Sequence, residues 1–363
     1  MKYVLSFIVL LIGITYALRC QTDEQKEAYQ IGMQAIEEMN NGNYNRAIDK
    51  LDSAIALDSA SILYPYEKAL CYYKLEEYEN AIKLLDSLKD HEQVFDMIYQ
   101  ILGNSHDFLG EKEAAIDVYN EGLEKFPNSG RLYQELGITE FGRERMRRAV
   151  GYWEQGIKVD PMYPKNYYRL AKHYSKTAER MWGIIYGELF QILSDGTRKI
   201  EEISGILYGT YSTALFDFMQ GERQVKLTGL KIRTNRKMTI AEKPFRLVYQ
   251  SAYKAVDKSY SEKIGNEMNF ESVTLFRKKF LEEWFSGKYT EHFDIALFDY
   301  QKKILDAGYF DVYSHWSLQI GNYSAYKDWL KANKKKLEEF KKWLKNNPIE
   351  LDRENAVVRS KYN

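Results

Sequence analysis

The sequence of 363 residues predicts an all-α protein built from helical hairpins. Two observations lead to this fold class: small residues recur at a spacing of 34, and apolar residues recur at spacings of three and four. A period of this length is typical of a two-helix unit that buries its apolar side against the next unit. With 45% hydrophobic and 29% charged residues, the chain has a globular composition and enough length for two domains.

The small residues mark two positions in each repeating unit. Five alanine or glycine residues spaced 34 apart form one series. When this series is numbered as position 20 of a 34-residue unit, the units start at residues 28, 62, 96, 130 and 164. Position 20 is then Ala47, Ala81, Ala115, Ala149 and Gly183, and position 8 is Ala35, Ala69, Gly103, Gly137 and Ala171. Two helices cross closely only where side chains are small, so these positions predict where the hairpin helices cross.

The third and fourth units add a more specific pattern. Positions 4, 7, 24 and 32 are Tyr99, Leu102, Tyr119 and Pro127 in the third unit, and Tyr133, Leu136, Trp153 and Pro161 in the fourth. This pattern resembles the tetratricopeptide repeat family. The resemblance covers about residues 28–195 and implies a right-handed superhelix of about 4.5 to 5 hairpins, a concave groove and no catalysis. Gly187 occupies position 24 of the fifth unit, so we expect its second helix to be diverted.

The first 20 residues have the features of a targeting segment. Lys2 precedes an apolar run over residues 3–18, and a polar stretch follows. The run is shorter than the roughly 20 residues that a bilayer-spanning helix needs, so it predicts a secretory signal peptide over residues 1–20. The mature protein is then expected in the periplasm or outside the cell, without a membrane span. An uncleaved membrane anchor is the alternative.

Beyond residue 195 the 34-residue spacing stops. We therefore expect a repeat domain over residues 21–195 and an aromatic-rich helical domain over residues 196–363. Apolar stripes and capping residues in the second domain predict helices over 197–218, 244–260, 270–287, 291–307, 311–320, 324–332 and 334–346. Short alternation between Val225 and Ile240 predicts a small β-hairpin or a long loop.

Charge is distributed unevenly along the chain. Residues 1–221 hold 24 Lys and Arg against 33 Asp and Glu, whereas residues 222–363 hold 28 against 19. This asymmetry is typical of a basic patch for anionic partners, or of two halves that attract one another within or between copies. Nucleic acid is not an expected partner of an exported protein. The lysines of residues 334–342 also alternate with apolar residues, as on the solvated face of a helix.

The sequence predicts no catalytic residue, no cofactor and no metal site. It contains no phosphate-binding glycine loop, no HExxH pair, no CxxC pair and no nucleophile elbow. His292 has acidic neighbours in Glu291 and Asp294, but adjacent helical positions point in different directions. One cluster is a candidate pocket: His315 and Trp316 beside Tyr309, Phe310 and Tyr313. An enzyme in the C-terminal domain, with the repeats as its docking module, therefore stays an alternative.

The resemblance implies a binding surface on the inner side of the superhelix, lined by positions 2, 5, 9 and 12 of each first helix. These positions are Leu63, Tyr66, Leu70 and Tyr73, then Met97, Gln100, Asn104 and Asp107, then Arg131, Gln134, Ile138 and Phe141, and finally Lys165, Tyr168, Lys172 and Ser175. The change from apolar to basic fits an extended peptide or protein segment whose apolar part precedes an acidic part. We expect Tyr66, Tyr73, Arg131 and Lys172 to be the main anchors.

These observations together predict a non-catalytic scaffold or adaptor of the cell envelope that binds a protein or peptide in its groove. The alternative is that the C-terminal domain itself fills the groove. Some family members hold a C-terminal carboxylate there, but the chain departs from that pattern at Gln100 and Glu135. A carboxylate at Glu135 would repel such a ligand.

Overall fold

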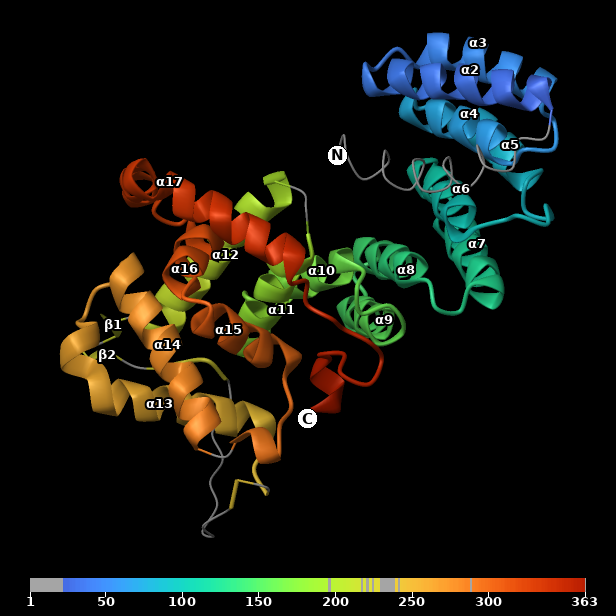
Figure 1. Cartoon of the computed structure of the whole chain (residues 1–363). Coiled ribbons are helices and arrows are strands. Elements are labelled where there is room, and N and C mark those ends of the chain that lie inside the picture. Colours follow the sequence, from blue (N-terminus) through green and yellow to red (C-terminus); the bar gives the residue numbers. More distant parts are fainter. Residues whose placement is uncertain are drawn as a thin grey trace. The chain divides into compact units, whose positions relative to one another are not determined.

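The computed structural model describes residues 22–194, 197–216, 218–219, 222–223, 225–228, 239–240, 242–287 and 289–362. These residues are helical almost throughout (Figure 1). The chain divides into two compact units, residues 1–152 and 153–363, and the division falls within α9 (Met146–Val159). The predicted signal peptide lies outside the described residues. Among the helices that are described, none combines the length and apolarity needed to cross a membrane.

Unit 1 is a series of helical hairpins. Its helices are α2 (Asp23–Asn40), α3 (Tyr44–Leu57), α4 (Leu63–Lys74), α5 (Tyr78–Asp86), α6 (Asp96–Phe108), α7 (Lys112–Lys125), α8 (Gly130–Gly142) and the first part of α9. The helices α6 and α8 begin at the predicted unit starts, residues 96 and 130. The helix α2 begins five residues before its predicted start at residue 28, because Thr22 and Gln25 form a capping box there.

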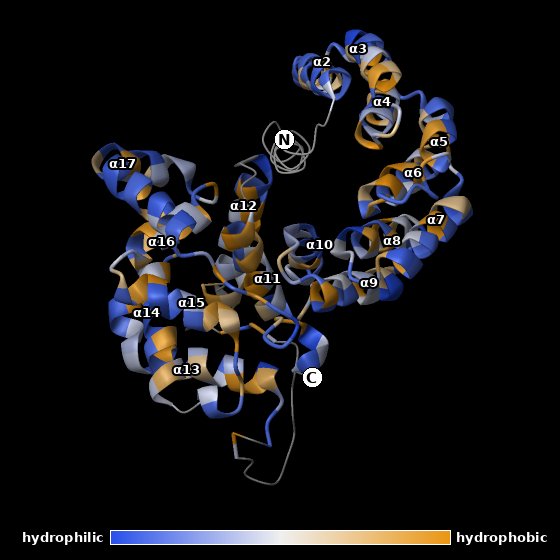
Figure 2. Ribbon diagram, turned by 45° about the vertical axis from the view of Figure 1, so that its right-hand side comes forward, coloured by the Kyte–Doolittle hydropathy of each residue, from blue (hydrophilic) through white to orange (hydrophobic). Residues whose placement is uncertain are grey.

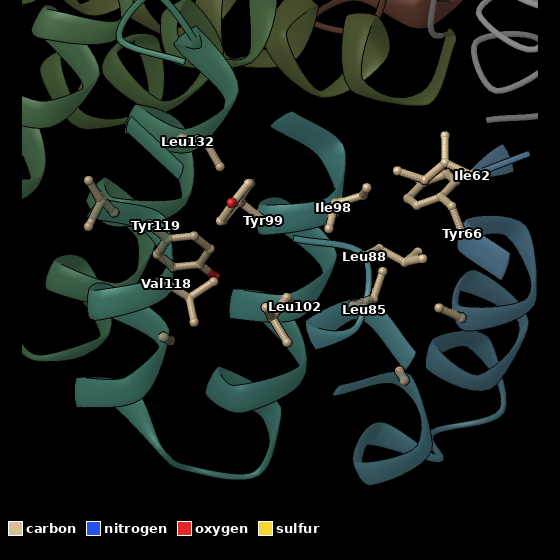
Figure 3. Packing of buried hydrophobic residues seen from close by; sticks show 14 residues of the cluster. Ile62, Tyr66, Leu85, Leu88, Ile98, Tyr99, Leu102, Val118, Tyr119 and Leu132 are labelled. Atoms are coloured by element: carbon tan, nitrogen blue, oxygen red, sulfur yellow. The ribbon is translucent and has the colours of Figure 1, made fainter. Parts of the chain in front are cut away.

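The predicted crossing positions form the core of unit 1. Ala35, Ala47, Ala69, Ala81 and Ala115 are all completely buried. Ala69, Ala81 and Ala115 share one cluster with larger side chains such as Tyr99, Leu102, Tyr119 and Leu132, which come from α6, α7 and α8 (Figure 3). The helices carry hydrophilic and hydrophobic residues side by side, as expected where one side of each helix is buried (Figure 2).

Unit 2 begins with the second part of α9 and the fifth predicted hairpin, α10 (Pro164–Tyr174) and α11 (Arg180–Leu193). The elements that follow are α12 (Thr197–Leu215), β1 (Phe218–Met219), β2 (Glu222–Arg223), α13 (Phe245–Ile264), α14 (Phe270–Ser286), η1 (Tyr289–Glu291), α15 (Ala296–Asp306), α16 (Phe310–Leu318), α17 (Tyr323–Asn346) and η2 (Arg359–Lys361).

The second helix of the fifth hairpin is the central helix of unit 2. It pairs with α10 as a repeat helix does, and it also packs against α12 and α15. Every residue of α11 from 181 to 191 is buried. Gly187 is explained by the contact with α12, because an added Cβ there would lie 2.8 Å from Cδ2 of Leu207. The predicted diversion of this helix is not seen, because α11 is continuous from Arg180 to Leu193. It differs from the earlier repeat helices in that α12 and α15 also pack against it.

Two helix predictions for the C-terminal region are corrected. The predicted helices 324–332 and 334–346 form one continuous helix, α17, in which the Asn333 side chain donates a hydrogen bond to the Trp329 carbonyl oxygen. The helix predicted from residue 291 begins at Ala296, after the short η1. A separate antiparallel strand pair joins 218–219 to 222–223. Most of the hairpin or loop predicted between Val225 and Ile240 lies outside the described residues, so it stays a prediction.

Candidate functional site

The first helices of unit 1 form a continuous surface. The helix α4 contacts α6, and α6 contacts α8, so consecutive first helices lie side by side. We call the side of α4, α6 and α8 that carries repeat positions 2, 5, 9 and 12 the first-helix face. This arrangement is how a helical repeat array builds an extended surface for a partner.

A chain of polar contacts ties α6 to α8 on the first-helix face. Ser129 donates a hydrogen bond of 2.5 Å to Asp96, and the Arg131 guanidinium lies 3.5 Å from the same carboxylate. Arg131 also donates to the Gln100 side-chain oxygen at 3.1 Å, and the Gln100 amide donates to Glu135 at 2.6 Å. Glu135 thus binds a neighbouring amide within the unit, which accounts for the departure from the carboxylate-binding pattern.

The structure sorts the predicted groove residues of unit 1 by burial. Leu63, Tyr73, Asn104, Asp107 and Arg131 are partly buried. Tyr66, Leu70, Gln100 and Gln134 are buried.

Tyr66, one of the four expected anchors, is buried. Its side chain is 3% exposed and its ring packs edge-on against Phe95, with 4.9 Å between ring centres. Its repeat position faces the next hairpin, so packing between hairpins covers it.

Exposed aromatic rings lie at the ends of neighbouring first helices. Phe108, in the last turn of α6, is 63% exposed, and Phe141, in the last turn of α8, is 51% exposed. Phe108 stacks on Tyr78 with 5.1 Å between ring centres and contacts Tyr73 edge-on at 5.8 Å. Burial, with a contribution from Glu135, raises the pKa of Tyr73 to about 12, so this phenol is neutral at physiological pH. We call Tyr73, Tyr78, Phe108 and Phe141 the aromatic strip.

The predicted groove residues of the fifth hairpin lie in unit 2 and have partners there. The Lys172 ammonium is 2.6 Å from a Glu202 oxygen on α12, and the Tyr168 hydroxyl donates to the other oxygen of the same carboxylate at 2.5 Å. Lys165 lies over the Tyr163 ring. The helix α12 therefore covers this part of the predicted binding surface, as in the alternative in which C-terminal helices fill it.

The candidate histidine cluster in unit 2 is an aromatic stack. The His315 ring lies between Phe270 and Trp329, with ring centres 4.6 and 4.3 Å away. Burial lowers the pKa of His315, which favours the neutral ring. His292 is exposed after η1. Within the described ranges, no three His, Cys, Asp or Glu side chains come together as a metal site requires.

Sequence reasoning missed a buried ion pair at the centre of unit 2. Arg277 of α14 and Glu188 of α11 are 2% and 1% exposed, and their charged atoms lie 3.0 Å apart. Tyr211 and Tyr313 donate to Glu188 at 2.7 and 2.8 Å, and Gln301 donates to it as well. Arg277 donates to the hydroxyl groups of two buried serines, Ser314 and Ser317.

The surroundings of the ion pair favour its charged form. Burial alone would lower the pKa of Arg277, but Glu188 together with the tyrosines around the pair outweighs burial and raises it. The pair also borders a small cavity lined by Tyr211, Tyr249 and Tyr253. Because buried charges persist only when paired and hydrogen-bonded, we assign this cluster to holding α11, α12, α14, α15 and α16 together. The signal in the sequence is Glu188 itself, a single charge within the apolar stretch from Met181 to Leu193.

Comparisons with known proteins give partial matches. Residues 15–88 match the family model described as anaphase-promoting complex, cyclosome, subunit 3. The photosystem I assembly protein Ycf3 of Synechococcus sp. (strain CC9605) is 30% identical over 101 residues, which cover 24% of this chain and 56% of that protein. The chain thus spans about half the length of this curated relative.

Two solved structures are similar over about half of the chain. The pilF protein of Pseudomonas aeruginosa is 14% identical, with 53% of this chain and 86% of that one covered and a TM-score of 0.43. YrrB, described as a TPR protein with an unusual peptide-binding site, is 15% identical, with 52% and 94% covered and a TM-score of 0.32.

The helices of the chain keep the predicted 34-residue register. Helical hairpins follow one another from Asp23 to Leu193, and from the second hairpin onward they begin within one residue of the predicted 34-residue register. Both crossing positions of that register are buried in every hairpin. Over these residues the chain has the fold of a tetratricopeptide repeat array.

Proposed function

We propose that the chain is a non-catalytic scaffold that binds a protein or peptide segment along the first-helix face of unit 1. One observation carries the proposal: Phe108 and Phe141 leave 63% and 51% of their side chains exposed at the ends of neighbouring first helices. Large rings gathered at one edge of a surface are typical of sites that a partner covers, and aromatic residues often supply most of the binding energy there.

The charge of unit 1 favours a basic partner. Residues 22–152 hold 14 Lys and Arg against 25 Asp and Glu. Asp107 lies on the first-helix face and Asp96 beside it, against the single guanidinium of Arg131. A segment that combines apolar side chains, to cover the aromatic strip, with a net positive charge would complement this surface and would associate faster at low salt.

The predicted contact residues have different parts in this proposal. Tyr73, Asn104, Asp107 and Arg131 would touch the partner together with the partly buried Leu63, whereas the buried Tyr66, Leu70, Gln100 and Gln134 form the floor. An acidic part of the partner at Lys165, Tyr168 and Lys172 would first have to displace Glu202. We therefore place the main contact in unit 1.

We also propose that the scaffold works in the cell envelope. The sequence of residues 1–20 supports this location, since a short apolar run after Lys2 is typical of a secretory signal. The repeat domain proposed for residues 21–195 would then be the partner-binding part of an exported protein.

The experiment combines capture with variants. The purified chain is immobilised, envelope proteins that it retains are identified, and the dissociation constant of each retained protein is measured. Phe108→Ala and Phe141→Ala should each weaken binding at least about fivefold, which corresponds to about 1 kcal/mol. Met162→Ala is the matched control, because Met162 is 46% exposed but lies in unit 2.

The outcomes separate the proposal from its rivals. Normal binding by both phenylalanine variants would contradict the proposed site. Loss of binding in Met162→Ala alone would move the site to unit 2.

A further inference from the structure

We propose that α17 binds anionic phospholipid membranes through a row of lysines, which we call the lysine face. The helix has 24 residues, among them eight lysines and three acidic residues. All eight lysines are exposed. Tyr326, Leu337 and Phe340 are buried, and Trp329 and Trp343 pack against other rings of unit 2, so one side of the helix holds it to the unit. It lies at the periphery of unit 2 in both views (Figures 1 and 2).

Five of the eight lysines lie on one side of the helix. Steps of three, four and seven residues connect the members of the lysine face, which are Lys327, Lys331, Lys334, Lys341 and Lys345. Residues at these spacings lie on the same side of an α-helix, and the row runs along most of a helix about 36 Å long. Lys335 and Lys342 flank the row, Lys336 lies on the opposite side, and Glu338 interrupts the row between Lys334 and Lys341.

Most of this charge is not neutralised within the chain. Lys331 pairs with Asp328 at 2.8 Å, and Lys335 lies 3.8 Å from Glu339. The other six lysines of α17 make no ion pair with any residue in the described part of the chain. Like charges four residues apart, as in Lys341 and Lys345, destabilise a helix. An anionic surface along the row would attract these lysines and offset their mutual repulsion.

Apolar groups beside the lysines favour a lipid surface over other polyanions. Tyr323 begins α17 and is 54% exposed, and Ile320, just before it, is 37% exposed. Tyrosine and aliphatic side chains settle at the level of lipid headgroups while lysines contact the phosphates, which is the usual arrangement of an interfacial helix. Duplex nucleic acid offers no apolar layer to these two side chains. The sequence of residues 1–20 separately predicts that the chain passes through a membrane during export.

Vesicle co-sedimentation of the full chain tests the proposal. Binding is compared between neutral phosphatidylcholine vesicles and vesicles with about 30 mol% phosphatidylglycerol, at about 100 mM and about 500 mM NaCl. We expect at least about tenfold tighter binding to the anionic vesicles at low salt, and loss of that preference at high salt. Residues 1–20 are common to all variants, so the measured quantity is the ratio between the two kinds of vesicle.

A charge-matched pair of variants locates the site. The α17 variant carries Lys334→Gln, Lys341→Gln, Lys342→Gln and Lys345→Gln. The control carries Lys254→Gln, Lys258→Gln, Lys263→Gln and Lys303→Gln, which remove four exposed lysines from α13 and α15. The anionic preference should fall at least about tenfold in the α17 variant and stay within about twofold of the wild type in the control.

Three results would overturn the proposal. Equal binding of the wild type to both vesicles would exclude an anionic-lipid site, and equal losses in the two variants would indicate a general charge effect. Displacement of the chain from vesicles by duplex DNA at equal phosphate concentration would favour nucleic acid as the occupant. The melting temperature of each variant is measured alongside, and a variant that melts early is replaced by its Lys→Arg version, which must restore binding.

Discussion

The Tyr119 ring fills the space in which a β-carbon of Gly103 would lie. A Cβ built on Gly103 would be 2.2 Å from Cε1 of Tyr119, far inside van der Waals contact. Tyr119 is 1% exposed and its hydroxyl donates a 2.6 Å hydrogen bond to Asn104, so the ring is held in place. The two residues occupy positions 8 and 24 of the third repeat, and their contact is the reason that this unit needs glycine where others have alanine.

This contact predicts the effect of Gly103→Ala. The added methyl group must displace the Tyr119 ring, so we expect the variant to lose about 1 to 3 kcal/mol of the free energy of unfolding. Gly151→Ala is the matched control, because nothing lies within 4 Å of its added Cβ and alanine favours the helix by up to about 1 kcal/mol. Gly137→Leu, at the same repeat position in α8, should destabilise as well. Thermal unfolding measures these differences. Equal stability of Gly103→Ala and Gly151→Ala would contradict the repeat register.

The repeat register could be predicted because its signals are local. Small residues at Ala81 and Ala115, and an aromatic residue at Tyr119, follow directly from the spacing between hairpin helices. The arrangement of unit 2 could not be predicted, because it depends on contacts between distant segments. Glu188 and Arg277, for example, are 89 residues apart and meet only in the folded unit.

The candidate site shows the same limit. Repeat positions indicated which side of each first helix forms the surface, but the burial of Tyr66 depends on Phe95, which precedes the next hairpin. The repeat position of Lys172 predicts a cation available to a partner, whereas in the structure Lys172 forms an ion pair with Glu202 on α12. Whether a side chain at a repeat position is exposed depends on residues outside its own repeat, so the repeat pattern alone does not predict it.

The buried ion pair predicts a large difference between two neighbouring residues of α14. Arg277→Met would leave the Glu188 carboxylate buried without its cation, at a cost of about 3 to 5 kcal/mol. Lys278→Met breaks a partly exposed pair with Asp311 and should cost at most about 1 kcal/mol. Urea unfolding at pH 7 compares the two. Similar midpoints for both variants would mean that the ion pair does not hold unit 2 together.

Glu67 predicts a pH dependence of stability. Burial raises the pKa of this carboxyl from 4.5 to about 7 in the folded chain. The folded state therefore holds the proton more tightly, and the stability that this provides is complete below pH 4.5 and is lost as the pH rises through about 7. Glu67→Gln should exceed the wild type in stability by about 2 to 3 kcal/mol at pH 8 and match it near pH 4.

The control for Glu67 is Glu79→Gln, which changes an exposed carboxyl on the neighbouring helix α5. Chemical unfolding across this pH range should give the same curve for this variant and the wild type. A Glu67→Gln curve parallel to the wild type at every pH would refute the assignment.

Export predicts the start of the mature protein. Signal cleavage should place the new N-terminus between Leu18 and Thr22, in an envelope or secreted fraction. N-terminal sequencing of the protein from its native cells measures this. A soluble cytoplasmic protein that still begins at Met1 would rule out the signal peptide.

The central claim is that a partner covers the aromatic strip of unit 1, and photo-crosslinking in the native cells tests it most directly. A photoreactive phenylalanine analogue replaces Phe108 or Phe141 in one set of strains and Met162 in another, all three being exposed positions. The account predicts the same crosslinked partner from positions 108 and 141, and none from position 162. Equal crosslinking from Met162, or no adduct at Phe108 and Phe141 in cells where position 162 yields one, would contradict it.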